Sequence, residues 1–165
     1  MTASVVGTLG QLPSPSIGLA VHELLMTGLG WPLELGFTYF FNQQERIHAT
    51  SGQISASLML GSIAACPWQP VAGVALCGGT EVGRLGITTQ QFVQDGSTSQ
   101  LVVDVFGSGL MDLRVAGPLH LRAELSLAMP FTRRPYVVET RNGSKQLFRM
   151  SIVSGRAQFG LGAQF

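Results

Sequence analysis

Charged residues are scarce in this chain. Only 12% of its 165 residues are Asp, Glu, Lys or Arg, whereas about 25% is typical of soluble domains. The hydrophobic content is an ordinary 45%, and glycine (21 residues) together with Ser, Thr and Gln replaces the missing charge. Long hydrophobic runs are also lacking, because no stretch of 18 apolar residues occurs, and this excludes a transmembrane helix. The net charge of +1 excludes a strongly basic nucleic-acid binder.

A low charge content without a membrane-spanning helix is typical of a closed transmembrane β-barrel. Besides the α-helix, a closed barrel is the structure that satisfies all its own backbone hydrogen bonds in lipid. The length predicts one domain over residues 1–165. Met1-Thr2-Ala3 has neither a basic nor an apolar region of a signal peptide, so we expect a mature form or a barrel cut from a longer chain.

What the chain does contain is strict alternation, most clearly in residues 119–129. Every odd position there is apolar, and the even positions are polar, charged or small, including His120, Arg122, Glu124 and Ser126. This period of two predicts a strand with one apolar and one polar face. Eleven residues are also about the length that a tilted strand needs to cross a bilayer.

Eight segments are predicted as strands, and their connections alternate in length. The segments are 3–11, 16–27, 31–41, 51–66, 71–86, 100–113, 119–130 and 150–165. Short turns are expected near 28–30, 67–70 and 115–118, and longer loops near 42–50, 88–99 and 132–149. Transmembrane barrels show this asymmetry, with short periplasmic turns and longer external loops. The sequence therefore predicts an all-β, eight-stranded, antiparallel up-and-down transmembrane barrel.

The apolar face is expected to point to lipid and the polar face to the lumen. The expected outward residues are Trp31, Leu33, Leu35, Phe37, Tyr39 and Phe41 in the third strand, Ile54, Ala56, Leu58 and Leu60 in the fourth, and Val103, Val105 and Met111 in the sixth. Aromatic residues near strand ends resemble interfacial girdles. Glu23 shares the apolar parity and is expected at the rim or beside a bulge. The alternative is a soluble, lipocalin-like ligand-binding barrel with its faces reversed.

A polar lumen would hold several charged side chains. They are Glu34, Glu81, Asp104, Asp112, Arg122, Glu124 and Arg156. Opposite charges in a narrow interior must pair or bind water, so we predict a network joining Arg122 and Arg156 to some of Glu34, Glu81, Asp104 and Glu124. Such a network is either part of a gated, ion-conducting path or a structural plug. We predict the plug, because eight strands leave room for little more than side chains.

The two cysteines, Cys66 and Cys77, flank the turn signal Pro67-Trp68-Gln69-Pro70. We predict a disulfide between them across a hairpin, with two free buried thiols as the alternative. Counting along the strands places Cys66 in the outward set and Cys77 in the inward set, so a bulge or an irregular turn must intervene.

At its C-terminus the chain resembles the small outer-membrane β-barrels of Gram-negative bacteria, in the OmpA/OmpX-like size class. Phe159, Leu161, Ala163 and the terminal Phe165 resemble the signal by which such proteins are recognised for assembly. Segments 76–85 and 127–133 are similar to uncharacterised barrels of this kind. The resemblance implies residence in the bacterial outer membrane, and as partners the lipid bilayer, lipopolysaccharide and the assembly machinery. We also expect a monomer.

The polar residues form no motif for catalysis, cofactor binding or metal binding, so we predict a non-enzymatic protein with a structural, adhesive or narrow-pore role and no cofactor. The alternative is a lipid-modifying enzyme in which His48 and Ser51, with Glu45 nearby, act on lipid A. His120 is expected to donate or accept hydrogen bonds in the lumen. The basic residues of the last long loop are expected to contact either lipopolysaccharide phosphates or only solvent; they are Arg133, Arg134, Arg141 and Lys145.

Overall fold

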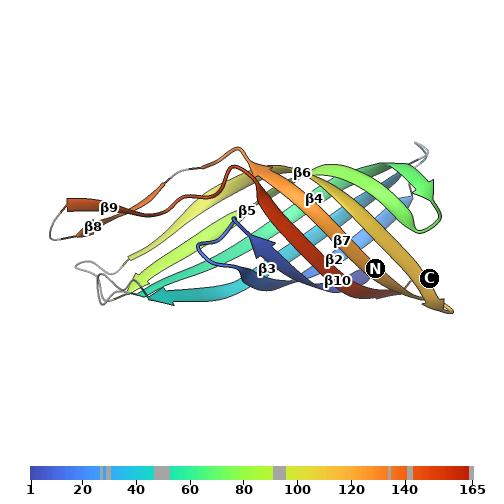
Figure 1. Ribbon diagram of the computed structural model, residues 1–165, viewed down its shortest axis with the longest axis horizontal. Helices are drawn as coiled ribbons and strands as arrows, with labels where there is room; N and C mark the ends of the chain where they lie inside the picture. The colour runs from blue at the N-terminus through green and yellow to red at the C-terminus, as the bar shows by residue number, and fades with distance from the viewer. Residues whose placement is uncertain are drawn as a thin grey trace.

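Eight strands form a closed antiparallel barrel, as the alternation predicts (Figure 1). The computed structural model describes residues 1–26, 28, 31–46, 53–90, 96–133, 135–140 and 143–163. The barrel strands are β1 (Thr2–Leu9), β2 (Ser16–Met26), β3 (Pro32–Arg46), β4 (Gln53–Val71), β5 (Val74–Gln90), β6 (Gly96–Ala116), β7 (Leu119–Pro130) and β10 (Ser154–Ala163). Two further strands, β8 (Tyr136–Thr140) and β9 (Gly143–Phe148), pair with each other as a separate hairpin.

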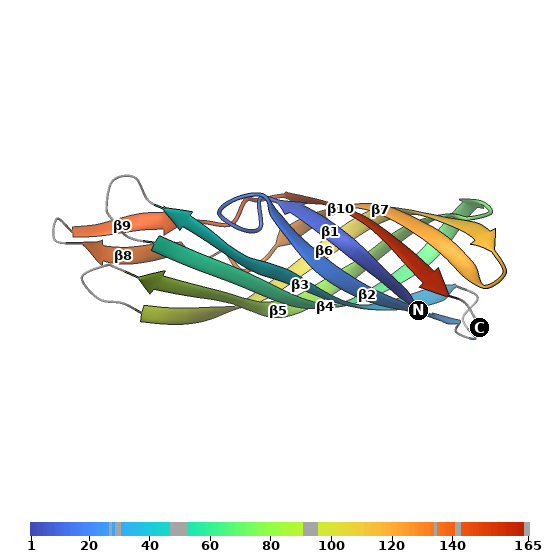
Figure 2. The same cartoon turned by 90° about the horizontal axis from the view of Figure 1, so that it is seen from below.

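The barrel closes where β1 pairs with β2 on one side and with β10 on the other. Thr2 lies opposite both His22 and Gly162, so no strand edge is free at this height. The start of β1 and the end of β10 lie at the end of the barrel that carries the β4–β5 and β6–β7 turns (Figure 2). We call this the inner end, and the opposite end, near β8 and β9, the outer end.

The turns at the inner end are short. The β6–β7 turn contains Gly117, whose φ of 54° favours glycine, and it confirms the predicted turn at 115–118. The turn predicted at 67–70 is wrong. β4 continues to Val71 and turns at Ala72 and Gly73, where φ is 81°. The prolines are accommodated because the β4–β5 register shifts twice in this region, and proline is tolerated at bulges.

Four strands, β3 to β6, extend beyond the others at the outer end (Figure 1). They contain 15, 19, 17 and 21 residues, whereas β7 contains 12. They therefore include parts of the loops predicted at 42–50 and 88–99. The hairpin of β8 and β9 likewise lies inside the loop predicted at 132–149. In all three places the backbone continues as antiparallel strands that pair with their neighbours, instead of leaving the sheet as a loop.

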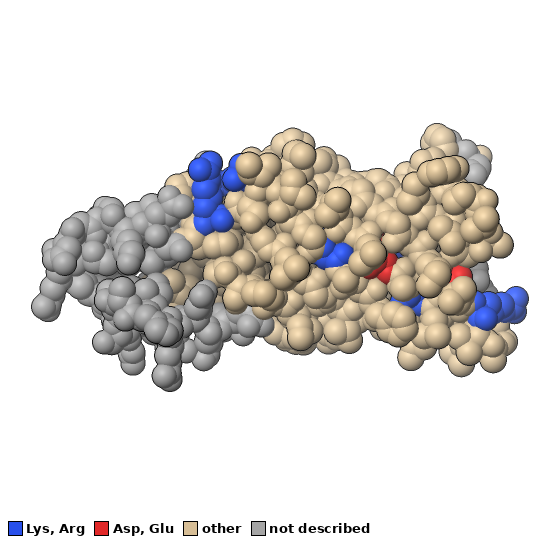
Figure 3. Space-filling model, viewed as in Figure 1, with Lys and Arg blue, Asp and Glu red and all other residues tan. Residues whose placement is uncertain are grey.

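The exterior of the barrel is apolar. Its outward side chains include Val5, Leu19, Leu35, Phe37, Ile63, Val82, Leu113, Leu125, Leu127, Phe159 and Leu161, all of which are exposed. The face in Figure 3 is mostly uncharged, with larger basic patches towards the two ends of the described surface and a few charged atoms visible midway along the barrel. Glu23 pairs with Leu35 just beyond the start of β1, so it lies at the inner rim. Of the two positions expected for Glu23, the rim or a bulge, the structure shows the rim. The described part of the chain contains no helix with the length and hydrophobicity that a helical membrane span requires.

Candidate functional site

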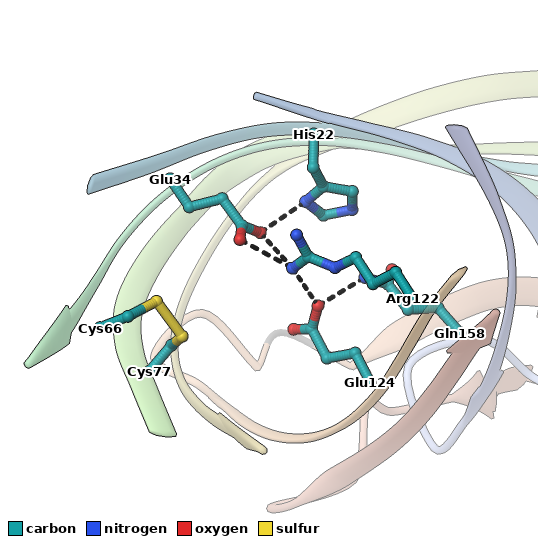
Figure 4. Close-up of a disulfide and its surroundings, with 7 residues drawn as sticks. All are labelled: His22, Glu34, Cys66, Cys77, Arg122, Glu124 and Gln158. Atoms are coloured by element: carbon teal, nitrogen blue, oxygen red, sulfur yellow. Dashed lines mark hydrogen bonds and ion pairs between the residues drawn. A yellow bond between two sulfur atoms is a disulfide. The ribbon is translucent and has the colours of Figure 1, made fainter. Parts of the chain in front are cut away.

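The lumen contains two clusters of ion pairs, and the lower one, nearer the inner end, centres on Arg122 of β7. Arg122 Nη2 lies 2.7 Å from Glu34 Oε2 and 2.6 Å from Glu124 Oε2 (Figure 4). Arg122 and Glu124 share the inward face of β7 because they are two residues apart, and Glu34 reaches them from β3. One guanidinium is thus shared by two carboxylates, and all three side chains are at most 8% exposed.

Two more strands join the lower cluster. His22 Nδ1 of β2 lies 2.8 Å from Glu34 Oε1, and Gln158 of β10 donates from Nε2 to Glu124 Oε2 over 2.6 Å (Figure 4). Gly36 makes room for the histidine, because a Cβ there would lie 2.9 Å from His22 Nδ1. The lower cluster therefore ties together β2, β3, β7 and β10.

The upper cluster lies nearer the outer end and centres on Arg156 of β10. Its guanidinium forms a bidentate pair with the Glu81 carboxylate of β5, with Nη1 2.7 Å from Oε1 and Nη2 contacting Oε2. Asp104 Oδ2 of β6 lies 3.7 Å from Arg156 Nη2. Gln11, from the β1–β2 connection, accepts from Arg156 Nε over 3.0 Å and donates to Asp104 Oδ2 over 2.8 Å. The structure therefore groups the six residues of the predicted network into two clusters of one arginine and two carboxylates each.

Beyond the upper cluster the lumen becomes apolar. The buried residues there are Val6, Leu12, Ala20, Phe40, Ile54, Ala56, Leu58, Leu60, Leu85, Ile87, Val102 and Met150. Most belong to the barrel wall, but Leu12 and Met150 come from the connections before β2 and before β10. Ser151 N donates to Gly10 O over 3.0 Å and joins these two connections. The outer end is therefore closed by close-packed apolar side chains.

The prediction that the apolar residues of β4 face lipid is wrong. Ile54, Ala56, Leu58 and Leu60 are at most 8% exposed and belong to the apolar interior. Ser55 and Ser57 alternate with them on the outward face. The outer part of this segment, residues 54–57, belongs to the protruding sheet, where we infer that water rather than lipid surrounds the wall, so that polar residues face outward and apolar residues inward, as in a soluble sheet. Leu58 and Leu60 pair with Phe40 and Thr38, which β2 still flanks, so these two leucines lie within the closed barrel and fill its apolar interior.

The disulfide between Cys66 and Cys77 is confirmed, and it joins β4 to β5 near the inner end (Figure 4). Both cysteines are buried, at 1% and 9% exposure, and pack with Ala64, Ala75 and Leu110. The prediction that Cys66 faces outward is wrong, because Cys66 shares the buried, inward parity of Leu60 and Ala64 on β4. The register that pairs Ala65 with Gly78 places Cys66 opposite Cys77, so both side chains point inward and no irregularity is needed to bring them together.

At the inner end, His120 of β7 lies beside Thr2 and Asp112. Its Nε2 lies 3.1 Å from Thr2 Oγ1 and 3.6 Å from Asp112 Oδ2. Asp112 is therefore apart from both ion-pair clusters, with its side chain 40% exposed. Within the part of the chain that the structure describes, no group of three or more His, Cys, Asp or Glu residues is arranged to hold a metal ion.

Several candidate residues lie outside the described residues, namely His48, Ser51, Arg134, Arg141 and Phe165. Glu45 lies in β3 and Lys145 in β9, where only the backbone is described. Of the proposed assembly signal, Phe159 and Leu161 are exposed on the outward face and Ala163 is half-buried. Arg133 Nε donates to Met150 O over 3.2 Å at the outer end.

Gln11, Leu12 and Met150 are interior residues that the sequence analysis did not predict, whereas Gln158 lies on the inward face of the last strand with Arg156, as its parity predicts. The sequence carries no signal for Gln11 and Leu12, because they stand next to Pro13-Ser14-Pro15 in a connection without periodicity. Their inward placement depends on tertiary contacts with Asp104, Arg156 and the apolar interior.

Comparison with solved structures shows the fold of outer-membrane β-barrels. A major outer membrane protein from Thermus thermophilus superposes with a TM-score of 0.65 at 15% identity, covering 99% of each chain. A second structure is that of Ail, the attachment invasion locus protein of Yersinia pestis, in complex with the heparin analogue sucrose octasulfate. It superposes with a TM-score of 0.60 at 11% identity, covering 99% of this chain and 97% of Ail. No protein-family model and no curated protein sequence matches this chain.

Proposed function

We propose that this chain is an integral β-barrel of a bacterial outer membrane with a structural or adhesive role and a lumen closed to ions. The observation that carries the proposal is the filling of the lumen, where two ion-pair clusters lie beneath a close-packed apolar outer end. An apolar exterior supports residence in lipid, since side chains such as Leu125 (69% exposed) and Leu161 (63% exposed) have no partner for burial within the barrel.

The filled lumen argues against the narrow-pore alternative. A permeant ion would have to separate Arg122 from Glu34 and Arg156 from Glu81, and then cross the apolar layer around Phe40. Separating a buried ion pair leaves uncompensated charges and is strongly unfavourable. An eight-stranded barrel offers no second route, because its interior is just wide enough for side chains.

Planar-bilayer recording tests the closed lumen. The purified barrel is expected to give flat current traces, because no continuous aqueous path crosses the layer of Phe40, Leu58 and Val102. An open porin reconstituted from the same preparation is the positive control. Reproducible conductance steps from this barrel would contradict a closed lumen and favour the pore.

We also propose the lipid bilayer, lipopolysaccharide and the outer-membrane assembly machinery as partners. Arg133 and the exposed Arg149 lie at the outer end, where cations would meet lipid phosphates. No catalytic arrangement supports the enzyme alternative within the described residues. A lipid A mass spectrum that changes when the protein is expressed would favour that alternative.

The protruding sheet of β3 to β6 favours the adhesive role. β2 pairs with β3 only as far as Phe40, and β7 pairs with β6 only from Asp104 onward. The outer part of β6, residues 96–102, therefore has a strand partner on one side only, within the part of the chain that the structure describes. A free strand edge is a template for pairing with an extended segment of another protein.

Backbone alternation identifies which groups of β6 are free to pair. Val103 bonds towards the β7 side, since its N–H donates to Thr132 Oγ1 and its carbonyl accepts from Phe131 N. Successive residues of a strand point their N–H groups to opposite sides, and the β5–β6 register has no shift. Ser97 and Ser99 therefore direct their N–H groups to the free edge, whereas Thr98 bonds towards β5.

Proline at the free edge tests adhesion. The variant Ser97→Pro is expected to lower the adherence of cells displaying the barrel, because it removes an edge N–H without breaking the β5–β6 ladder. The matched control is Ser97→Ala, which keeps the N–H and should adhere as the unchanged protein does. Equal adherence of all three proteins, at equal surface amounts, would contradict recognition through this edge.

A further inference from the structure

The disulfide between Cys66 and Cys77 belongs to a single hairpin, formed by β4 and β5. The two cysteines are 11 residues apart in the chain, and the β4–β5 ladder runs without a register shift from Gln53 to Ala65, the residue before Cys66. Opposite residues of an antiparallel hairpin are brought together by that hairpin alone. The two thiols can therefore meet as soon as β4 and β5 pair, before the other strands close the barrel.

In the closed barrel the two sulfur atoms are enclosed. Both side chains point into the lumen (Figure 4), and the two residues are only 1% and 9% exposed. Towards the outer end, the upper ion-pair cluster and the apolar interior fill the lumen. At the inner end, a cavity of about 220 Å³ that Cys66 lines has room for small molecules but not for a folded protein. No protein partner can therefore bring a sulfur atom to Cys66 or Cys77.

Thiol–disulfide exchange requires direct contact between sulfur atoms. One thiolate attacks a sulfur of the oxidant's disulfide and forms a mixed disulfide, which the second thiolate then resolves. Both steps depend on access to the reacting sulfur atoms. The enclosed position of Cys66 and Cys77 therefore excludes exchange with a protein oxidant once the barrel has closed.

We propose that a periplasmic disulfide oxidase acts on this chain before the barrel closes, and that its substrate is the unassembled chain with β4 and β5 accessible. The Cys66 and Cys77 thiols together lose two electrons and two protons, and the disulfide of the oxidase gains them and becomes a dithiol. The barrel then closes around a covalently joined hairpin. This step is independent of the structural or adhesive role, because it concerns the chain before assembly.

The position of the disulfide indicates what oxidation contributes to assembly. Beyond Ala65 the β4–β5 register shifts twice, first before Trp68 and again before Val71. Pro67 and Pro70 lie in this irregular part and cannot donate to a ladder. A hairpin outside a larger sheet is only marginally stable, and a cross-link restricts its unfolded conformations. We expect the disulfide to hold β4 in register with β5 until β3 and β6 pair with them.

Oxidation before and after folding tests this order. The chain is purified with both cysteines reduced and is either diluted without lipid, where no barrel forms, or folded into lipid nanodiscs, which leave both ends accessible. Each sample receives the same oxidised periplasmic disulfide oxidase, and the remaining thiols are counted by a gel shift after maleimide–polyethylene glycol labelling. Oxidation is expected to be about 100-fold or more slower in the folded barrel.

A cysteine pair in the protruding sheet is the matched control. Ser55 and Thr88 lie opposite each other on the outward face of the same two strands, and Thr88 is exposed. The variant Cys66→Ser/Cys77→Ser/Ser55→Cys/Thr88→Cys moves the two thiols to this position, where the oxidase can reach them. Its oxidation in the folded barrel should be within about tenfold of its oxidation in the unfolded chain. Heat-resistant electrophoretic mobility identifies the folded barrel in each sample.

Two results would overturn the proposal. One is oxidation of Cys66 and Cys77 at similar rates in the folded barrel and the unfolded chain, which would mean that a protein oxidant reaches them after closure. The other is equally slow oxidation of the control pair in the folded barrel, which would remove enclosure as the cause. A reduced chain that fails to fold would support the proposal, because oxidation must then precede closure.

Discussion

Replacing Arg122 with methionine is expected to lower the free energy of unfolding by about 3–5 kcal/mol. The guanidinium is the one cation within 2.7 Å of both Glu34 and Glu124 among the described residues, and these carboxylates are buried from water. Removing it leaves two negative charges close together in a poorly hydrated lumen. The penalty comes from these unpaired charges rather than from loss of the arginine itself. Urea unfolding in lipid vesicles, followed by tryptophan fluorescence, measures the change.

Two further variants separate this cause from simple loss of packing. The triple variant Arg122→Met/Glu34→Gln/Glu124→Gln removes the charges together and should recover most of the lost stability. Arg114→Met removes an exposed arginine whose Nε donates to Gly117 O in the β6–β7 turn, and it should leave the stability within about 0.5 kcal/mol. If the triple variant were as unstable as the single one, buried charge would not be the cause.

The sequence predicted the barrel and its charged interior because one physical rule governs most of the chain. Where lipid surrounds a strand, outward residues must be apolar, and any charge must alternate with them on the inward face. Residues 119–129 obey this rule throughout, so Arg122 and Glu124 could be placed in the lumen from parity alone. Their partners could not be placed, since the distance from β7 across the lumen to Glu34 depends on how the barrel closes.

The same rule explains the error in β4. Ile54 to Leu60 show clear alternation, but alternation does not say which medium surrounds the strand. Along this segment the apolar residues point inward, both in the protruding sheet and just below it, where Leu58 and Leu60 are at most 1% exposed. Strand length carried the missing information, because β4 contains 19 residues and a transmembrane strand needs about 9–11. A strand much longer than the bilayer requires must change its pattern where it leaves the lipid.

The closure of the outer end could not be predicted at all from local patterns. Gln11 is fully buried between Asp104 and Arg156, and it belongs to a connection between two strands. A side chain in a connection has no periodic neighbours that would report its direction. Its position is set instead by hydrogen bonds to Asp104, which is 93 positions away in the chain, and to Arg156, which is 145 positions away. Such contacts exist only after the barrel has closed.

The lipid-facing side of β7 leads to the second large effect, and Leu125→Arg is expected to lower the free energy of unfolding by about 2–4 kcal/mol. Leu125 is 69% exposed on the outward face, midway along a strand that runs from Leu119 to Pro130. An arginine there would place its charge near the middle of the hydrocarbon layer. Urea unfolding in vesicles measures this loss, as it does for Arg122.

Leu119→Arg is the matched control because it makes the same substitution on the same outward face of β7. Leu119 is 52% exposed and follows the turn at Gly117, so a charge there reaches the membrane interface. Its cost should be only about 0–1 kcal/mol. If the two variants differ in their free energy of unfolding in lipid vesicles, as expected, the depth of the charge in the lipid decides the cost, because the strand and the substitution are the same. Equal costs at both positions would mean that water rather than lipid surrounds β7, and would contradict the membrane barrel.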